Sequence, residues 1–141
     1  MTIQKAIDRV FSIRPDSFST EEKVEWLNTL DGQVYIETIL THENPDQIVF
    51  APYDPSNLDV ELLIPFPYDK VYLSYLKSMI AASYGENDEY NNAAVEYNKN
   101  MNEFKAYWNR RHLPVLEGAK TSSLAKEMYI YPDETPLERK I

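Results

Sequence analysis

The chain has 141 residues, no Cys and a formal net charge of −9, with 43% hydrophobic and 26% charged residues. This length fits one domain with a real core, and the lack of Cys excludes a disulfide framework, a thiolate nucleophile and a zinc site built on sulfur. Because an acidic chain is repelled by nucleic acid and by anionic membranes, we expect neither sequence-specific nucleic acid binding nor a membrane partner.

Two helices are predicted at the start of the chain. Residues 2–11 place five apolar side chains on one helical face, with Thr2 as the N-cap. Ser19 and Glu22 fit a capping box that opens a second helix. The predicted apolar faces are Ile3, Ala6, Ile7, Val10 and Phe11 in the first helix, and Val24, Leu27, Leu30 and Val34, widened by Ile36, Ile39 and Leu40, in the second.

Gly32 lies inside the second predicted helix, where Gly is less favourable than Ala by about 1 kcal/mol. Its presence favours close packing of this helix against another helix. A kink at Gly32 is the alternative interpretation.

The segment 41–67 breaks the helical pattern. It is rich in Pro and keeps only two short apolar runs, "QIVF" at 47–50 and "LDVELLI" at 58–64. The second run alternates in part like a strand, and "PYDPSN" between the runs has turn composition. The sequence therefore predicts a short β-hairpin or an extended loop insertion here.

Two further helices are predicted to form a central antiparallel helix hairpin. Pro67 suits the start of the first helix, Gly85 its C-cap, and Asn87 the N-cap of the next helix, which ends before Pro114. The first helix is apolar over more than half of its circumference, so we expect it to be central. The predicted buried stripes are Val71, Tyr72, Tyr75, Met79 and Ala82, flanked by Leu76, Ile80 and Ser83, and then Tyr90, Ala94, Tyr97, Met101, Phe104 and Trp108.

The last predicted helix is unusually rich in Asn away from its apolar stripe. Asn is a poor helix former, and a solvated face more often carries Glu and Lys. One interpretation is a plain solvated face. The other is a surface that meets another protein through side-chain amides, which donate and accept hydrogen bonds without the desolvation penalty of charge. The residues concerned are Asn91, Asn92, Asn98, Asn100, Asn102 and Asn109.

The residues predict no catalytic, cofactor or metal site. Three Gly residues are too few for a P-loop or a dinucleotide fingerprint. The two His residues, His42 and His112, lack a second His or a carboxylate at ligand spacing on a shared face. We therefore expect a protein that is not an enzyme and that binds no cofactor.

The predicted fold class is mainly α: a small helical bundle of about four helices. The helical core domain covers residues 1–114 with the loop insertion at 41–67, and residues 115–141 form an extended C-terminal tail. Chain ends are loose unless they are tied down, yet this tail carries the apolar motif "MYIY" at 128–131. The motif either folds back onto the core or docks on a partner.

Three segments occur in the order "EWLNTLDGQVYIETI", "ELLIPFPYDKVYLSYLKSMIAASYGENDEYNNAAVEYN" and "FKAYWNRRHLP". They resemble a family of small virion neck proteins of tailed phages and prophages, similar to the head–tail connector (adaptor) proteins. The most specific parts are "PYDKVYLSYL" and the "YNN…YN…F…YWNRRH" pattern, and the likeness covers residues 1–114. The resemblance implies a helical bundle that assembles as a ring between the portal protein and the next neck (stopper) protein, and that is compatible with a monomer in isolation.

The resemblance also implies a place and a set of contacts. The protein would be assembled in the host cytoplasm and lie at the head–tail junction of the virion, with its C-terminal segment reaching the portal and its central loop contacting a neighbour. The alternative hypothesis is an acidic phage-encoded protein that binds and inhibits a host protein. The interface residues expected from the resemblance and from the amide face are Val49, Phe50, Tyr53, Asn98, Asn102, Met128, Tyr129, Ile130, Tyr131, Arg139 and Lys140.

Overall fold

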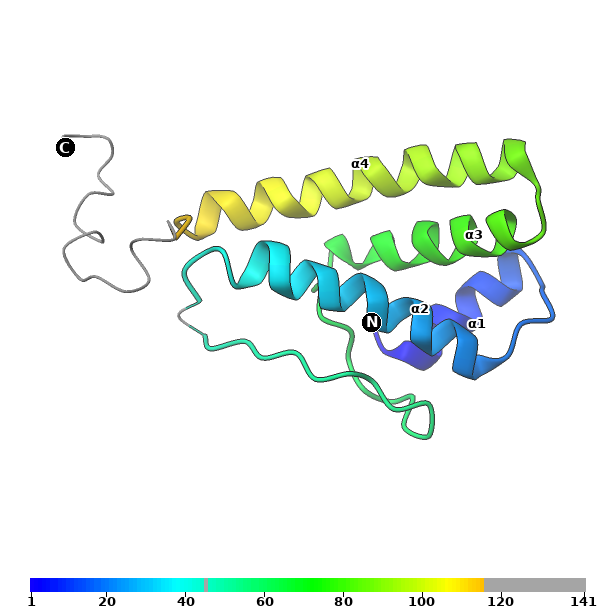
Figure 1. Ribbon diagram of the computed structural model, residues 1–141, viewed down its shortest axis with the longest axis horizontal. Coiled ribbons are helices and arrows are strands. Elements are labelled where there is room, and N and C mark those ends of the chain that lie inside the picture. Colours follow the sequence, from blue (N-terminus) through cyan, green and yellow to red (C-terminus); the bar gives the residue numbers. More distant parts are fainter. Residues whose placement is uncertain (45, 116–141) are drawn as a thin grey trace, which may run out of the picture.

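The computed structural model describes residues 1–44 and 46–115, which form a small helical bundle (Figure 1). Within these residues the structure contains no sheet, and the mainly α fold class is confirmed. The elements in chain order are α1 (Ile3–Ile13), α2 (Thr20–Val34), the π-helical turn η1 (Tyr35–Ile39), the 3₁₀ turn η2 (Tyr68–Lys70), α3 (Val71–Ser83) and α4 (Asn87–Arg111).

α3 is the central helix of the bundle, as predicted. It packs against α1, α2 and α4 and has buried side chains around most of its circumference. α4 runs antiparallel to it after a tight connection at Gly85, whose φ of +72° lies in the left-handed region that favours glycine. The N-cap of α4 is Glu86 and not Asn87, because Asn87 already belongs to the helix.

Side-chain caps start the first two helices at the predicted residues. The hydroxyl of Thr2 accepts a hydrogen bond from a backbone N–H in the first turn of α1 at 3.1 Å, and Ser19 and Glu22 form the reciprocal capping box of α2. Four of the five predicted apolar residues of α1 are buried, but Phe11 is 48% exposed. Phe11 lies at the edge of the stripe, where the Lys23 ammonium covers its ring at 5.5 Å.

Gly32 does not pack against another helix, so that prediction is wrong. A Cβ built at Gly32 would meet the ring of Phe50, a residue of the 41–67 loop, at an ordinary contact distance of 3.8 Å. The absence of a side chain at Gly32 therefore leaves space between α2 and the Phe50 ring of the loop. It does not mark a close approach of two helix backbones.

A π-helical turn after α2 changes the direction in which the following side chains point. In η1 the Leu40 N–H donates to the Tyr35 carbonyl at 2.9 Å, five residues back. This wider turn rotates the following side chains relative to an α-helix. Ile39 is buried as predicted, whereas Ile36 and Leu40 are 63% and 44% exposed, so the predicted widening of the buried face is wrong for these two residues. Ile36 follows the buried Val34 by two residues and therefore faces away from the core side of the helix.

The segment 41–67 takes the form of an extended loop, and its described residues form no hairpin. Its second apolar run pairs with the start of the chain: the carbonyls of Leu58 and Val60 accept hydrogen bonds from Gln4 and Ile3 at 2.9 and 3.1 Å. The run therefore pairs with residues 1–4 and not with "QIVF". Of the predicted strand-like alternation, the structure shows only the burial of Leu62 and Ile64.

The buried stripe of α4 follows the prediction in its second half and departs from it in the first. Met101, Phe104 and Trp108 are buried, but Tyr90 is 41% exposed. Tyr90 belongs to the first turn of α4, so the departure from the predicted stripe lies at the start of the helix. Ala93 and Asn100 take buried places that the predicted stripe omits.

Candidate protein-interaction surfaces

The first predicted interface segment, residues 49–53, is held against α2 and η1 by its own aromatic side chains. The ring of Phe50 lies 6.2 Å from that of Tyr35 and 5.3 Å from that of Tyr53. Phe50 and Tyr53 are thus half-buried, whereas Val49, which precedes Phe50, is 77% exposed. Of these three predicted contact residues, Val49 is the one whose side chain is fully available to a partner.

Asp31 of α2 fixes this loop to the bundle. Its carboxylate is fully buried and accepts hydrogen bonds from the hydroxyls of Tyr53 at 2.5 Å and Tyr72 at 2.7 Å. It also accepts the Leu63 N–H at 3.2 Å, while the Ile64 N–H donates to the Tyr72 hydroxyl at 2.7 Å. Two positions of the loop and one of α3 therefore converge on a single carboxylate.

Burial sets the ionisation of this cluster. It raises the pKa of Asp31 to about 6, although the hydrogen bonds from Tyr53, Tyr72 and Leu63 act in the opposite direction. Burial and the nearby Asp31 charge raise the pKa of both tyrosines, which therefore remain hydrogen-bond donors. Because the buried Asp31 carboxylate binds two positions of the loop, we assign the cluster an anchoring role.

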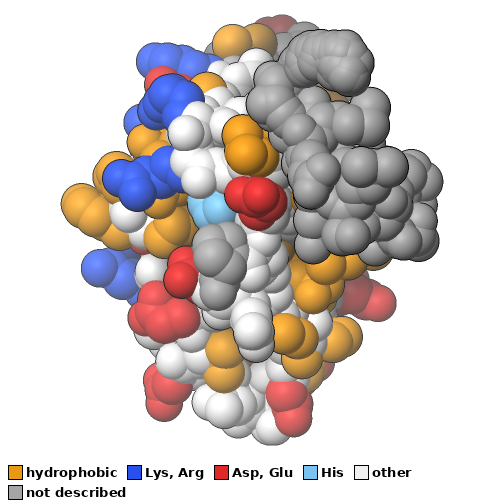
Figure 2. All heavy atoms as spheres, turned by 90° about the vertical axis from the view of Figure 1, so that its left-hand side faces the viewer, with side chains coloured by type: hydrophobic (Ala, Val, Ile, Leu, Met, Phe, Trp, Pro, Cys, Tyr) orange, Lys and Arg blue, Asp and Glu red, His pale blue; other side chains and the backbone are white. Residues whose placement is uncertain are grey.

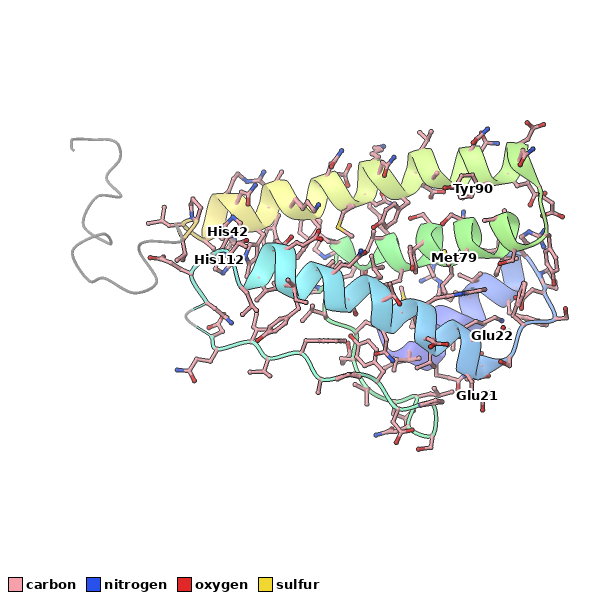
Figure 3. The ribbon with its side chains drawn as sticks, in the orientation of Figure 1. Glu21, Glu22, His42, Met79, Tyr90 and His112 are labelled. Carbon is pink, nitrogen blue, oxygen red and sulfur yellow. The ribbon has the colours of Figure 1, made fainter. Side chains whose placement is uncertain are left out.

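The loop brings acidic side chains to one end of the molecule. The Asn28 side chain exchanges two hydrogen bonds with the backbone of Tyr53, so the turn that follows lies beside the first turns of α2. Figure 3 shows Glu21 at this end of α2, next to the tip of the loop. We call this surface the acidic end; its exposed carboxylates are Glu21, Glu25, Asp54 and Asp59.

The second predicted interface region, on α4, lies on the opposite side of the bundle from the loop (Figure 1). Asn98 and Asn102 are exposed and point away from α3. Asn100 is different: it is 5% exposed and donates to the Ser74 hydroxyl at 3.2 Å, so its amide serves the α3–α4 contact. The structure therefore separates the loop residues from the α4 amides instead of joining them in one site.

The outward side of α4 carries amides, small apolar groups and cations. We call it the outer face of α4. Successive helical turns present these side chains to solvent, and Val95 among them is 69% exposed. The outer face consists of Asn91, Val95, Asn98, Lys99, Asn102, Lys105, Ala106, Asn109 and Arg110.

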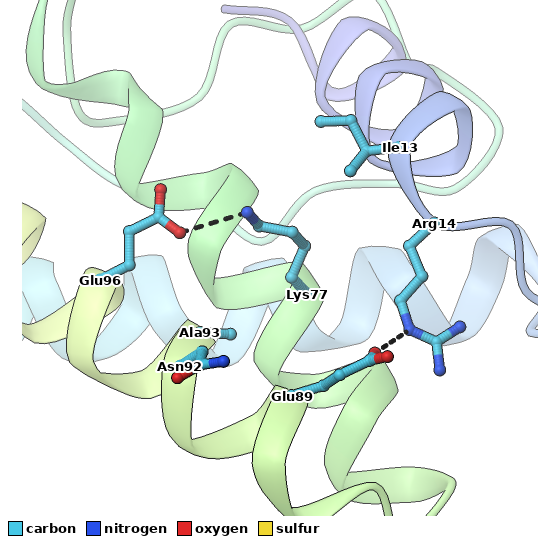
Figure 4. A pocket seen from close by; sticks show the side chains of 7 residues that line it. All are labelled: Ile13, Arg14, Lys77, Glu89, Asn92, Ala93 and Glu96. Atoms are coloured by element: carbon cyan, nitrogen blue, oxygen red, sulfur yellow. Dashed lines mark hydrogen bonds and ion pairs between the residues drawn. The ribbon is translucent and has the colours of Figure 1, made fainter.

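Three of the four carboxylates of α4, Glu89, Glu96 and Glu103, lie on its flank and are each paired with a cation, whereas Asp88 in the first turn forms no ion pair with a described residue. Glu89 lies 2.9 Å from Arg14 of the α1–α2 connection, and Glu96 lies 3.2 Å from Lys77 of α3. These two pairs line an open groove of about 280 Å³ between α1, α3 and α4 (Figure 4). Arg14 and Lys77 are each paired with a carboxylate, and the exposed Ile13 adds an apolar side chain to the lining. These groove side chains therefore suggest an ion-paired surface and not a catalytic site.

Aromatic and cationic side chains gather at the end of the bundle where α4 stops. Figure 2 shows Lys and Arg side chains along one side of this end, interleaved with hydrophobic ones, and Asp and Glu mostly lower down. Tyr107 stacks on Tyr68 at 4.6 Å, and the Arg111 guanidinium lies 5.4 Å from the Tyr107 ring. The neighbouring turn exposes 83% of Phe66.

The two His residues meet at the same end of the bundle (Figure 3). The Nδ1 atom of His42 lies 2.7 Å from the Thr38 carbonyl. The ring of His112 stacks on Trp108 at 3.7 Å, with its Nδ1 3.1 Å from the Trp108 carbonyl. Both rings thus close the ends of their helices. The part of the chain that the structure describes holds no group of three His, Cys, Asp or Glu residues that could bind a metal ion.

The remaining predicted interface residues fall outside the described residues. They are Met128, Tyr129, Ile130, Tyr131, Arg139 and Lys140. Sequence reasoning had also missed the Asp31 anchor and the cations of the outer face. An acidic residue inside the predicted apolar stripe of α2 was the available signal for the anchor.

No protein-family model matches the chain, and neither a curated protein nor a solved structure matches it. Among the residues that the structure describes, no helix is long and apolar enough to cross a membrane.

Proposed function

We propose that this protein is a structural component of a tailed-phage neck that links the portal to the next head–tail connector protein. The observation that carries the proposal is the ordered resemblance of three segments within residues 1–114 to neck adaptors. The fold is compatible with it: a connector has to hold two partners at a fixed spacing. A bundle with a central helix provides such a rigid body.

The anchored loop adds a second argument. An extended loop that meets a neighbour must keep its shape without a sheet to stiffen it. Here Asp31 binds both Tyr53 and the Leu63 backbone, which restrains the loop on either side of its tip. The exposed Val49 precedes Phe50, whose ring packs between those of Tyr35 and Tyr53, so its segment is also held against the bundle. Such pre-organisation lowers the entropic penalty of binding.

The test is reconstitution with the portal encoded beside this gene. Purified protein and portal are mixed, and the mass of any complex is measured by native mass spectrometry. We expect a multi-copy complex. Val49→Asp should weaken it, since a charge replaces an exposed apolar contact, whereas the matched change Ser12→Asp, at an exposed position on α1, should not. A well-folded protein that gives no complex with the portal contradicts the proposal.

The acidic end favours a second candidate function, an acidic phage protein that occupies a basic site of a host protein. Glu21, Glu25, Asp54 and Asp59 offer such a site a group of exposed carboxylates. Inhibition of a host DNA-binding enzyme by the purified chain, lost on Asp54→Asn with Asp59→Asn, would support this candidate over the connector.

A further inference from the structure

The outer face of α4 and the acidic end carry opposite charge on opposite sides of the bundle. We infer that copies of this chain associate head to tail, with the outer face of α4 of one copy against the acidic end of the next. The inference rests on the proposed function for its biological role, because it supplies the contact between neighbours in a connector ring. Its test needs no portal.

The outer face of α4 is built as a contact surface in a chain that is otherwise acidic. Over the described residues, Lys99, Lys105 and Arg110 form no ion pair, in contrast to the paired Lys70 and Lys77 on the flank. The three cations span about 17 Å of helix at 1.5 Å per residue. Amides and the exposed Val95 lie between them, so a partner can be bound without burying an unsatisfied charge.

The acidic end is the matching surface. Over the same described residues its four carboxylates form no ion pair with any Lys or Arg, although Glu61 nearby binds the chain's amino group at 3.0 Å. The tip of the loop is held by hydrogen bonds to Asn28 and by the Leu58 and Val60 backbone contacts with α1. These carboxylates are therefore fixed in place relative to the bundle.

Charge decides between the two ways in which copies could meet. A symmetric contact of α4 with α4 would place the cations of Lys99, Lys105 and Arg110 near those of the partner, and like charges across an interface are strongly disfavoured. Contact between unlike faces pairs cations with carboxylates. Such a heterologous contact continues from copy to copy and closes into a ring if its rotation closes.

Charge reversal tests the pairing in the full chain. Self-association is measured by sedimentation velocity for the wild type, for Lys99→Glu with Lys105→Glu, for Asp54→Lys with Asp59→Lys, and for all four changes together. Each double variant should associate at least about tenfold more weakly, and the fourfold variant should recover, because its charges are complementary again. Arg9→Glu, on the exposed side of α1, is the control and should associate like the wild type.

Cross-linking tests the geometry. Because the chain has no Cys, Asn102→Cys and Asp59→Cys each introduce one thiol, and a short bis-maleimide joins thiols that lie close together. Head-to-tail contact predicts covalent dimers when the two variants are mixed and few when either is alone. Dimers from Asn102→Cys alone would indicate a symmetric contact and overturn the inference. A wild type that stays monomeric at every concentration, or double variants that associate like the wild type, would also overturn it. Head-to-tail dimers without portal binding would leave the inference standing and refute the proposed function.

Discussion

The buried carboxylate of Asp31 makes a quantitative prediction about the pH dependence of stability. Its pKa is about 6 in the folded protein against an ordinary value of 3.8. The folded state therefore holds this proton more tightly than the unfolded chain, and the contribution of Asp31 to stability falls as the pH rises between these two values. A shift of this size corresponds to about 3 kcal/mol over the whole window, and roughly half of that lies above pH 5.

Comparison with Asp31→Asn isolates this effect. The variant keeps the size of the side chain but does not titrate, and both proteins share the general loss of negative charge on acidification. The free energy of unfolding is measured by urea titration with Trp fluorescence between about pH 5 and 7.5, so that the wild type is compared with the variant at each pH. The wild type should lose about 1.5 kcal/mol relative to the variant over this range.

The result that would refute the reasoning is a constant difference between the two proteins across the pH range. It would mean that Asp31 is solvated or paired differently from the hydrogen bonds with Tyr53, Tyr72 and Leu63. A difference that changes in the opposite direction would show that the hydrogen bonds outweigh burial.

Three further predictions concern the core, α2 and the tail. Trp108→Ala should lower the free energy of unfolding by about 3 kcal/mol or more, as a large core truncation, and unchanged thermal unfolding would show that Trp108 is not a core residue. Gly32→Ala should raise the free energy of unfolding by up to about 1 kcal/mol, because the new methyl group meets Phe50 at an ordinary distance; a loss of stability would show that the loop cannot accommodate it. Removing residues 119–141 should leave thermal unfolding intact and weaken the portal complex, and a truncated chain that fails to fold would place the tail in the core.

Local signals predicted the helices well because their causes lie within a few residues of each other. Thr2 and the Ser19–Glu22 pair are caps whose partners are in the same turn, and Gly85 supplies a backbone conformation that other residues rarely adopt. The mistakes share a different cause. The burial of Phe11 and the surroundings of Gly32 depend on which elements pack beside them, and the local sequence pattern does not contain that information.

Two features could not be predicted because they join residues far apart in the chain. Asp31 meets hydroxyls from positions 53 and 72, and in the sequence it is simply an acidic residue within a helix. The buried Asn100 was grouped with the exposed amides, although it lies one turn before the buried Phe104, because the buried face of α4 is wider than a stripe of two residues per heptad. Both cases are buried polar groups, whose identity is explained only by the partner that satisfies them.

The Asn residues of α4 therefore have two physical explanations within one helix. Asn100 faces α3, where the small Ser74 accepts its hydrogen bond and permits close approach. Asn98, Asn102 and Asn109 face solvent, where Glu or Lys would be better helix formers. Additional Glu there would cancel the positive charge of the outer face, and additional Lys would raise its desolvation penalty on binding. Amides avoid both effects, so the inferred contact with an acidic neighbour would explain why α4 carries Asn in spite of its lower helix propensity.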